Sequence, residues 1–441
     1  MKKSCCWIGK QVLGFLLLLA TLWLQGCGND SVVSQENDFK LQSEETAASQ
    51  NDQIDIESSK TVQSSLEQVS DMVQSSSKAN IKTNSRTTSS RQQTLSSAES
   101  KLTVTSSEAS AQNHKKSMEI LFIGDSNVEV GNITSPIKDK LDAEYGYTGS
   151  GYTSLNEDFF TPKRNGVRVV NDIHWMKYDM VSYQKRLSPP FDAAQGLWVS
   201  SDTKDAVTIA DFRGTSVDIY YLAQPNGGSF AIEIDDKQRE IVNTSATSRC
   251  SKKVTIDGLS EQELHRMRLI VKEGSVSLQG FDAKNNAVRG VIHSWGNSSA
   301  ATKDFLAVEE SVMRTGLTEL NPSIVVLMIG TNDHVVDRLP AEHFKNNLIT
   351  LISRVKQALP ESKILVCSTV QTDTPEAKTL LKEYVARAFP EAAQETGCAY
   401  FDLSSFFGSY RKSLMMDAYH PNEAGGEKIA DELWNQIQKL K

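Results

Sequence analysis

Three short segments contain the residue types that acyl transfer to a hydroxyl nucleophile requires. A Gly-Asp-Ser run stands at 124–126, a Gly-Thr-Asn-Asp run at 330–333, and an Asp-x-x-His-Pro motif at 417–421. A serine hydroxyl is a weak nucleophile at neutral pH. It needs a base, which an imidazole supplies when a carboxylate holds it in the right tautomer. The segments therefore indicate a candidate serine hydrolase site.

Each side chain of this pattern has a candidate role. We interpret Ser126 as the nucleophile, His420 as the base, and Asp417 as the acid that orients the base. The spacing of three residues lets the Asp417 carboxylate and the His420 imidazole meet across a single turn. Asn332 brings a side-chain amide that can donate to the negative oxygen formed during acyl transfer, together with the Ser126 backbone N–H.

The polar residues beside the motifs are expected to serve the structure. Asp125 and Asp333 are interpreted as hydrogen-bond acceptors of turns rather than as acids. His293 and His334 flank the motifs and are interpreted as structural rather than substrate-binding residues. No histidines and acids have helical metal-ligand spacing, so we expect neither a metal nor a cofactor.

Apolar runs place the first two motifs at strand ends. Such runs at 118–126, 323–330, 363–369 and 398–403 are typical of strands buried on both faces. Strands that alternate with helices predict a parallel sheet covered on both sides, with ligand crevices at the carboxyl ends of the strands. The last helix is expected after Pro421. Two sets of apolar residues are expected to share a helix face: Phe305, Val308, Val312 and Met313, and then Phe344, Leu348, Leu351, Ile352, Val355 and Leu359.

The stretch 150–290 has a different texture. Short alternating segments, such as SVDIYYLA from Ser216 and HRMRLIVK from His265, are separated by Gly, Asn and Asp. This pattern predicts an inserted antiparallel β-sandwich or jelly roll. Its aromatic residues could stack on sugar rings, but aromatics in such strands more often form core. Those considered are Trp175, Trp198, Tyr220 and Tyr221.

The N-terminal region indicates export and anchoring. Residues 1–26 resemble a secretory signal, with lysines before an apolar run that is too short to span a bilayer. Leu24-Gln25-Gly26-Cys27 resembles the bacterial lipobox, which predicts cleavage before Cys27 and its acylation. Residues 27–117 are rich in Ser, Thr, Gln and Asn and predict a disordered tether. We therefore expect a lipid-anchored protein of the bacterial cell envelope, on the extracytoplasmic side of the membrane, at the outer membrane or facing the periplasm in a Gram-negative envelope.

Charge and cysteine content restrict the partners and the chemistry further. The net charge of -8 is spread along the chain without a basic run beyond the signal, so nucleic acid is not an expected partner. Once Cys27 is acylated, Cys250, Cys367 and Cys398 remain in the folded part. An odd number predicts free thiols rather than a disulfide framework.

The three motifs, in this order, resemble those of the SGNH (GDSL-type) serine hydrolases over 118–149 and 291–441. The arrangement most resembles bacterial carbohydrate and peptidoglycan O-acetylesterases, in which a β domain similar to a carbohydrate-binding module follows the serine motif. The resemblance implies a three-layer α/β/α, flavodoxin-like fold. The segment from His293 to Ala300 resembles the second family motif, with Ser299 where a glycine is usual. The implied third oxyanion donor is the backbone N–H of Ser299 or, failing that, of Gly296.

The resemblance implies a serine esterase that removes O-acetyl groups from a cell-wall glycan. Its expected partners are acetylated peptidoglycan or polysaccharide and, through the lipid anchor, the membrane. One alternative is an esterase for acetylxylan or another polysaccharide, or an esterase or lipase for small esters. A second alternative is a non-catalytic, carbohydrate-binding surface lipoprotein. The intact set of Ser126, Asn332, Asp417 and His420 argues against it.

Overall fold

The computed structural model describes residues 118–156, 167–182, 185–288, 290–407 and 412–441. The expectations for the signal peptide, Cys27 and the tether concern residues outside these ranges. Within the ranges, no helix combines the length and the apolar character needed to cross a bilayer.

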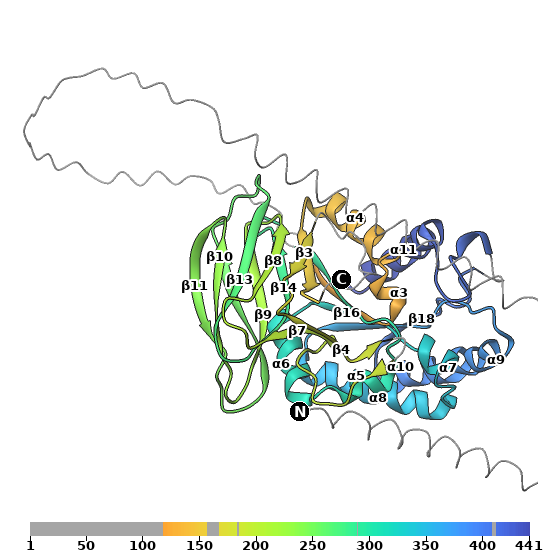
Figure 1. Ribbon diagram of the computed structural model, residues 1–441. Coiled ribbons are helices and arrows are strands. Elements are labelled where there is room, and N and C mark those ends of the chain that lie inside the picture. The colour runs from red at the N-terminus through yellow and green to blue at the C-terminus, as the bar shows by residue number, and fades with distance from the viewer. Residues whose placement is uncertain (1–117, 157–166, 183–184, 289, 408–411) are drawn as a thin grey trace, which may run out of the picture. The chain divides into compact units, whose positions relative to one another are not determined.

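A parallel five-stranded sheet forms the centre of the part expected to be a hydrolase, here called the hydrolase part (Figure 1). Its strand order is β15-β1-β16-β17-β18. The bounds are Met118–Gly124 for β1, Gly290–Gly296 for β15, Ile324–Met328 for β16, Lys363–Cys367 for β17 and Ala399–Phe401 for β18. The predicted parallel sheet is confirmed. β15 was not predicted as a separate strand, because His293 and Ser294 interrupt its apolar run.

Helices cover both faces of this sheet, as predicted. In β1, Ile120 and Phe122 share a core with α4 and α11, whereas Leu121 and Ile123 share a core with α6 and α8. Figure 1 shows α4 and α11 on one side of the sheet and α8 and α10 on the other. The helical elements are α3 Ser126–Glu129, α4 Thr134–Tyr145, α5 Thr302–Ala307, α6 Glu310–Leu320, α7 Thr331–Val335, α8 Ala341–Ala358, α9 Pro375–Glu383, η1 Tyr384–Ala388, α10 Phe389–Thr396, η2 Lys412–Leu414 and α11 Glu423–Gln438.

One predicted helix face belongs to two helices. Phe305 lies in α5, Val312 and Met313 lie in α6, and Val308 stands between the helices with an extended backbone (φ -62°, ψ 133°). All four residues still belong to one core, so the apolar pattern identified their burial correctly. The predicted helices over Phe344–Leu359 and after Pro421 correspond to α8 and α11.

Two larger antiparallel sheets form the sandwich of the insert, as predicted, and β5 and β6 form a separate antiparallel pair. The five-stranded sheet has the order β11-β10-β13-β8-β3, and the six-stranded sheet has the order β12-β9-β14-β7-β4 with β2 paired to β14. The bounds are β2 Gly149–Ser154, β3 Arg168–Asn171, β4 Met176–Asp179, β5 Val181–Ser182, β6 Lys185–Arg186, β7 Leu197–Ser201, β8 Val207–Phe212, β9 Ser216–Ala223, β10 Ser229–Ile234, β11 Lys237–Asn243, β12 Cys250–Asp257, β13 His265–Glu273 and β14 Val276–Lys284.

The six-stranded sheet is buried on both faces. In β9, Ile219 and Tyr221 belong to the core between the two sheets, whereas Tyr220 and Leu222 belong to the core that contains α6. The backbone N–H of Ser251 in β12 also donates to Thr315 Oγ1 in α6, at 2.8 Å. The insert therefore packs against a helix of the hydrolase part through one face of this sheet, at β9 and β12.

The aromatic residues considered as sugar-stacking platforms are core residues, as the pattern favoured. Trp175, Trp198, Tyr220 and Tyr221 are 2–7% exposed. A sugar ring has no access to these aromatic faces without displacing core residues. The predicted free thiols are confirmed for Cys250, Cys367 and Cys398, of which Cys367 is fully buried.

Candidate active site

Ser126, His420 and Asp417 form one continuous hydrogen-bonded chain. Ser126 Oγ lies 2.7 Å from His420 Nε2, and His420 Nδ1 lies 2.7 Å from Asp417 Oδ2. Ser126 and His420 are 294 positions apart in the sequence. The fold therefore brings together the three side chains that the sequence identified.

Ser126 stands at the end of β1, where the backbone turns sharply into α3. A Cβ atom on Gly124 would lie 2.2 Å from the carbonyl oxygen of Met328 in the neighbouring strand, so this position requires glycine. Asp125 caps α3 by accepting from the Asn127 N–H at 3.0 Å. Its second oxygen accepts from the Thr331 N–H at 3.2 Å, which joins the ends of β1 and β16. These contacts confirm the interpretation of Asp125 as a structural acceptor.

A tight loop before α11 holds the acid and the base. The Tyr419 and His420 N–H groups both donate to Asp417 Oδ1 at 2.8 Å, and the Met416 N–H donates to the His420 carbonyl at 2.8 Å. Asn132 ties the loop to the segment after α3 by donating to the Pro421 carbonyl at 2.8 Å. The orientation of the imidazole is therefore set before any substrate binds.

The electrostatics of Asp417 determine the tautomer of His420. Partial burial acts to raise the pKa of Asp417, but hydrogen bonds from the His420 ring and from the Tyr419 and His420 N–H groups outweigh burial and lower the pKa. An ionised carboxylate can only accept. His420 Nδ1 therefore carries the hydrogen that points to Asp417, and Nε2 is left to accept the hydroxyl hydrogen of Ser126.

The turn formed by residues 297–300, here called the 297–300 turn, explains the unusual serine of the second motif. The Ala300 N–H donates to the Asn297 carbonyl at 3.2 Å, and Ser299 has φ +66°, in the left-handed region that favours glycine. Among the described residues, none accepts from the backbone N–H of Ser299 or of Ser126. Serine therefore keeps the conformation and the free N–H that a glycine would give at this position.

Asn332 joins this turn from the end of β16. Its Nδ2 donates to the Ala300 carbonyl at 3.0 Å, and the residue is 9% exposed. An amide nitrogen carries two hydrogens, so this bond orients the group and leaves one donor for another acceptor. Together with Ser126 and Ser299, Asn332 supplies a third available N–H at the carboxyl edge of the sheet.

Gly296 has a different position from the other candidate donors. It ends β15 beside Gly124 of β1, and a Cβ atom on it would lie 2.2 Å from the backbone nitrogen of Glu129 in α3. The lack of a side chain therefore permits close packing of β15 against α3. Glu129, which the motifs did not identify, accepts from the Ser298 N–H at 2.5 Å. No local sequence signal could reveal this contact, because its partners are 169 positions apart.

The other polar residues near the motifs lie in the interior. Asp333 accepts from the Thr302 N–H and hydroxyl, and burial raises its pKa to about 7 against the effect of these bonds. His293 is 0% exposed and His334 is 1% exposed. Burial lowers the pKa of both, to about 4 for His334, so each imidazole is neutral at pH 7. Their interpretation as structural residues is therefore confirmed.

A cavity of about 390 Å³ lies beside the loop that follows β17. The Asp373 N–H donates to the Ala418 carbonyl at 3.3 Å, so this loop contacts the loop that holds Asp417 and His420. Thr372 lines the cavity, is 2% exposed, and has a hydroxyl with no hydrogen-bond partner. Within the described part of the chain, no group of three or more His, Cys, Asp or Glu residues could hold a metal ion.

The chain is similar to known proteins in part of its sequence and in its fold. Residues 279–428 match the model of the GDSL-like Lipase/Acylhydrolase family. A solved peptidoglycan O-acetylesterase has a TM-score of 0.61 at 12% identity, over 74% of this chain and 91% of that chain. A family two carbohydrate esterase from Clostridium thermocellum in complex with cellohexaose has a TM-score of 0.29 at 14% identity, over 60% of this chain and 98% of that chain. No curated protein matches the sequence.

The fold and the matched domain together define a carboxylic ester hydrolase. More specifically, the part of the chain over residues 279–428 is similar to the GDSL-like lipase/acylhydrolase family, as the motifs indicated. The matched range does not include Ser126, because the insert separates β1 from the rest of the domain. In the structure, β1 nevertheless belongs to the same sheet as the matched range, because it pairs with β15 on one side and with β16 on the other.

Proposed function

We propose that this protein is a lipid-anchored serine esterase that removes O-acetyl groups from a cell-wall glycan, with Ser126, His420 and Asp417 as its catalytic triad. The observation that carries the proposal is the continuous chain from Ser126 Oγ through the imidazole to Asp417, with 2.7 Å at each step. Peptidoglycan is the preferred glycan.

The first half of the reaction forms an acyl-enzyme. Ser126 Oγ attacks the carbonyl carbon of the acetyl ester while its hydrogen passes to His420 Nε2. The carbonyl oxygen becomes negative and accepts from the N–H groups of Ser126 and Ser299 and from the Asn332 amide. When the tetrahedral intermediate collapses, the bond to the sugar oxygen breaks. The sugar oxygen takes the hydrogen from His420 and leaves as a hydroxyl group.

The second half releases acetate. Water attacks the acetyl carbonyl carbon of the acyl-enzyme and gives a hydrogen to His420 Nε2, and the same N–H groups stabilise the new oxyanion. Cleavage of the bond to Ser126 Oγ returns that hydrogen to the serine and liberates acetic acid. Asp417 stays ionised throughout and stabilises the imidazolium that exists in each half.

The substrate part of the proposal depends on likeness and location. The solved structure with a TM-score of 0.61 is a peptidoglycan O-acetylesterase. A lipidated Cys27 and a long tether would hold the hydrolase beside the wall polymer. Thr372 lines a cavity, and the next residue, Asp373, contacts the loop of the triad through the Ala418 carbonyl; this supports a substrate that extends beyond the ester group. The volume of the cavity is within the range of about 300–1,000 Å³ for small-molecule sites.

Parallel measurements of acetate release test the proposed reaction and substrate. Wild type and Ser126→Ala are incubated with O-acetylated peptidoglycan, with acetylated xylan, and with a chromogenic acetate ester. We expect acetate release from O-acetylated peptidoglycan to be faster than release from acetylated xylan, and to depend on Ser126.

The alternatives give different results in the same experiment. Faster release from xylan would assign the enzyme to another polysaccharide, and activity on the chromogenic ester alone would assign it to small esters. A wild-type protein that releases no acetate but binds either polymer would be a carbohydrate-binding lipoprotein, and the proposal would be wrong.

The anchor has a separate test. Cys27→Ala should leave the protein in the aqueous phase of a detergent partition experiment, whereas wild type should enter the detergent phase. Cys250→Ala, which keeps Cys27, is the matched control and should partition as wild type does. Equal partitioning of Cys27→Ala and wild type would contradict the lipid anchor.

A further inference from the structure

Asn297 begins the 297–300 turn and is held by the insert. It is 0% exposed, and its Nδ2 donates to Asp179 Oδ1 at 3.1 Å and to the Gln195 carbonyl at 3.2 Å. Gln195 also donates its side-chain Nε2 to the Gly296 carbonyl at 2.8 Å. Asp179 and Gln195 of the insert therefore contact Asn297, the first residue of the turn, and Gly296, the residue before it.

The hydrolase part holds the same turn from its other side. The Asn297 N–H donates to the Gly124 carbonyl at 3.0 Å, and Glu129 accepts from the Ser298 N–H. Neither contact restrains the side of Gly296 and Asn297 that faces the insert. Gln195 is 4% exposed and supplies the restraint on that side.

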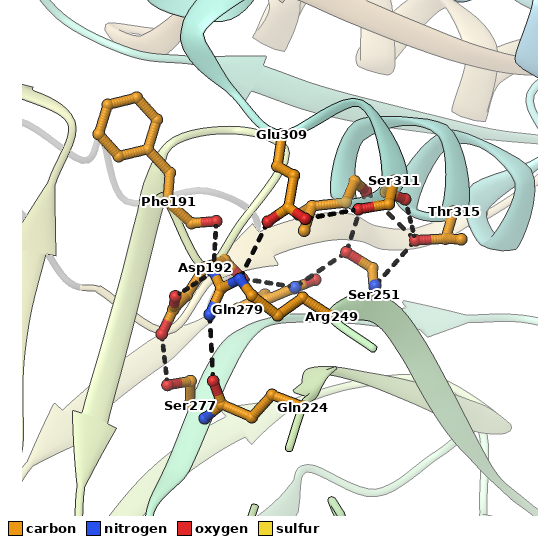
Figure 2. Close-up of polar contacts among 11 residues, drawn as sticks. Phe191, Asp192, Gln224, Arg249, Ser251, Ser277, Gln279, Glu309, Ser311 and Thr315 are labelled. Atoms are coloured by element: carbon orange, nitrogen blue, oxygen red, sulfur yellow. Dashed lines mark hydrogen bonds and ion pairs between the residues drawn. The ribbon is translucent and has the colours of Figure 1, made fainter. Parts of the chain in front are cut away.

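The segment that carries Gln195 is itself fastened to the sandwich. Figure 2 shows the network around Arg249, whose Nη2 donates to the Phe191 carbonyl at 3.1 Å and to Asp192 Oδ1 at 2.7 Å. Gln279 of β14 donates to the Asp192 carbonyl at 2.7 Å, and Ser277 donates to Asp192 Oδ2 at 2.6 Å. The chain just before Gln195 is therefore held by Arg249, which precedes β12, and by side chains of β14.

Arg249 links this segment to the hydrolase part as well. Its Nε donates to Glu309 Oε2 at 3.0 Å, immediately before α6 (Figure 2). Ser251 adds a second link, with its N–H bound to Thr315 and its hydroxyl donating to the Val312 carbonyl at 3.2 Å. The position of Gln195 is thus defined relative to α6 as well as to the sandwich.

We propose that Gln195 and Asp179 are positioning residues for the ester hydrolysis, because they hold the 297–300 turn so that the Ser299 N–H points at the oxyanion. This inference rests on the proposed function, since it concerns the oxyanion donors of that reaction. Neither residue contacts the reacting atoms. Their effect is on kcat, because an oxyanion donor acts in the transition state and a misplacement of about 1 Å can cost about 10²-fold in rate.

The test compares two buried amides that both connect the insert to the hydrolase part. Gln195→Met keeps the length of the side chain and removes the donor to Gly296. Asn285→Leu is the matched control, because Asn285 is 2% exposed and donates to the Tyr147 carbonyl at 3.1 Å, close to Gly290, where β15 begins. With a chromogenic acetate ester, we expect Gln195→Met to lower kcat at least tenfold with KM changed less than threefold. Asn285→Leu should keep kcat within twofold of wild type.

Asp179 provides an independent pair of variants. Asp179→Ala removes the acceptor for Asn297 and should lower kcat, whereas Asp179→Asn keeps an oxygen at that position and should retain most of it. This pair decides the question if Gln195→Met does not fold. Equal kcat in Asp179→Ala and wild type, or equal losses in both Asp179 variants, would overturn the inference.

The outcomes separate this inference from the proposed function. If Ser126→Ala hydrolyses the ester as fast as wild type, the proposed function fails and this inference fails with it. If hydrolysis depends on Ser126 but folded Gln195→Met has the wild-type kcat, only the positioning role is wrong. A lowered melting temperature with unchanged kcat would likewise assign Gln195 to stability alone.

Discussion

The central parallel sheet and the six-stranded sheet of the insert reach the candidate site in different ways. The parallel sheet brings Ser126 and Asn332 to the site at the ends of adjacent strands, each within a recognisable motif. The six-stranded sheet and the segment that leads into its strand β7 bring Asp179 and Gln195 to the 297–300 turn, through contacts that no motif predicts. The residues expected to contact substrate therefore lie in short sequence motifs, whereas the residues that position them are far apart in the sequence and belong to no motif.

The two sheets of the insert differ as well. The six-stranded sheet packs against α6 and is connected to Arg249, whereas the five-stranded sheet lies on the other side of the sandwich core. Its exposed large apolar side chains include Val170 and Ile241. The five-stranded sheet is thus expected to affect stability without affecting the site.

The largest effect is expected at the triad. Ser126→Ala and His420→Ala should each lower kcat by about 10⁴–10⁶, and the double variant should lose little more, because groups that act as one unit are not additive. Rates on a chromogenic acetate ester with proteins of verified fold provide the measurement. Wild-type activity in folded His420→Ala would show that the active site does not lie at the carboxyl edge of the parallel sheet.

The next largest effect concerns the oxyanion donor of the parallel sheet. Asn332→Ala should lower kcat by about 10²–10³ with a smaller change in KM, the usual result of deleting one preorganised donor. Because Asn332 also holds the Ala300 carbonyl, Asn332→Asp is a useful second variant that keeps the size of the side chain and removes its donor. A change in KM alone, seen in steady-state kinetics, would show that Asn332 binds substrate rather than the transition state.

The five-stranded sheet should respond in stability and not in rate. Phe230 of β10 is 0% exposed and belongs to the core between the two sheets. Phe230→Ala should lower the free energy of unfolding by about 3–5 kcal/mol. At a temperature where the variant remains folded, its kcat on a small ester should stay within twofold of wild type. A tenfold loss of kcat in folded Phe230→Ala would show that the five-stranded sheet also affects the site, contrary to this prediction.

Buried carboxylates in both parts predict a pH dependence of stability. Burial raises the pKa of Asp333 to about 7 and that of Asp282 in β14 to about 6. Between pH ~4 and these values the folded state binds protons that the unfolded state has lost, so stability falls as pH rises. Asp333→Asn should reduce the fall between pH 4 and 7 by roughly 3 kcal/mol. Urea unfolding at several pH values measures this, and an unchanged fall would show that Asp333 titrates normally.

The smallest effect is expected at Ser299. Ser299→Gly places the usual residue of the second motif at φ +66° and removes a strain of roughly 1 kcal/mol, partly offset by the greater flexibility of glycine in the unfolded chain. The melting temperature should rise by a few degrees at most, and kcat should stay within twofold, because the N–H is kept. A large loss of kcat would mean that the Ser299 side chain itself takes part in the reaction.

The amino-acid sequence alone determined the class of fold and the residues of the candidate triad. Strands buried on both faces require continuous apolar runs, and a nucleophile, base and acid each require one residue type at one place in a local motif. For this reason β1, β16, β17 and β18 could be predicted, and Ser126 could be connected to His420 across 294 positions. β15 could not, because His293 and Ser294 interrupt its apolar run. The structure buries these polar residues through long-range contacts, such as the bond from the Tyr152 N–H to His293 Nδ1.

Only the tertiary structure decided how the insert relates to the site. Gln195, Asp179, Glu129 and the Arg249 network consist of common polar residues at positions without periodicity or motif. Their significance comes from hydrogen bonds between segments that are about 60 to 170 positions apart. Such bonds depend on the path of the whole backbone, whereas hydrophobic periodicity and a local catalytic motif depend on a few neighbouring residues.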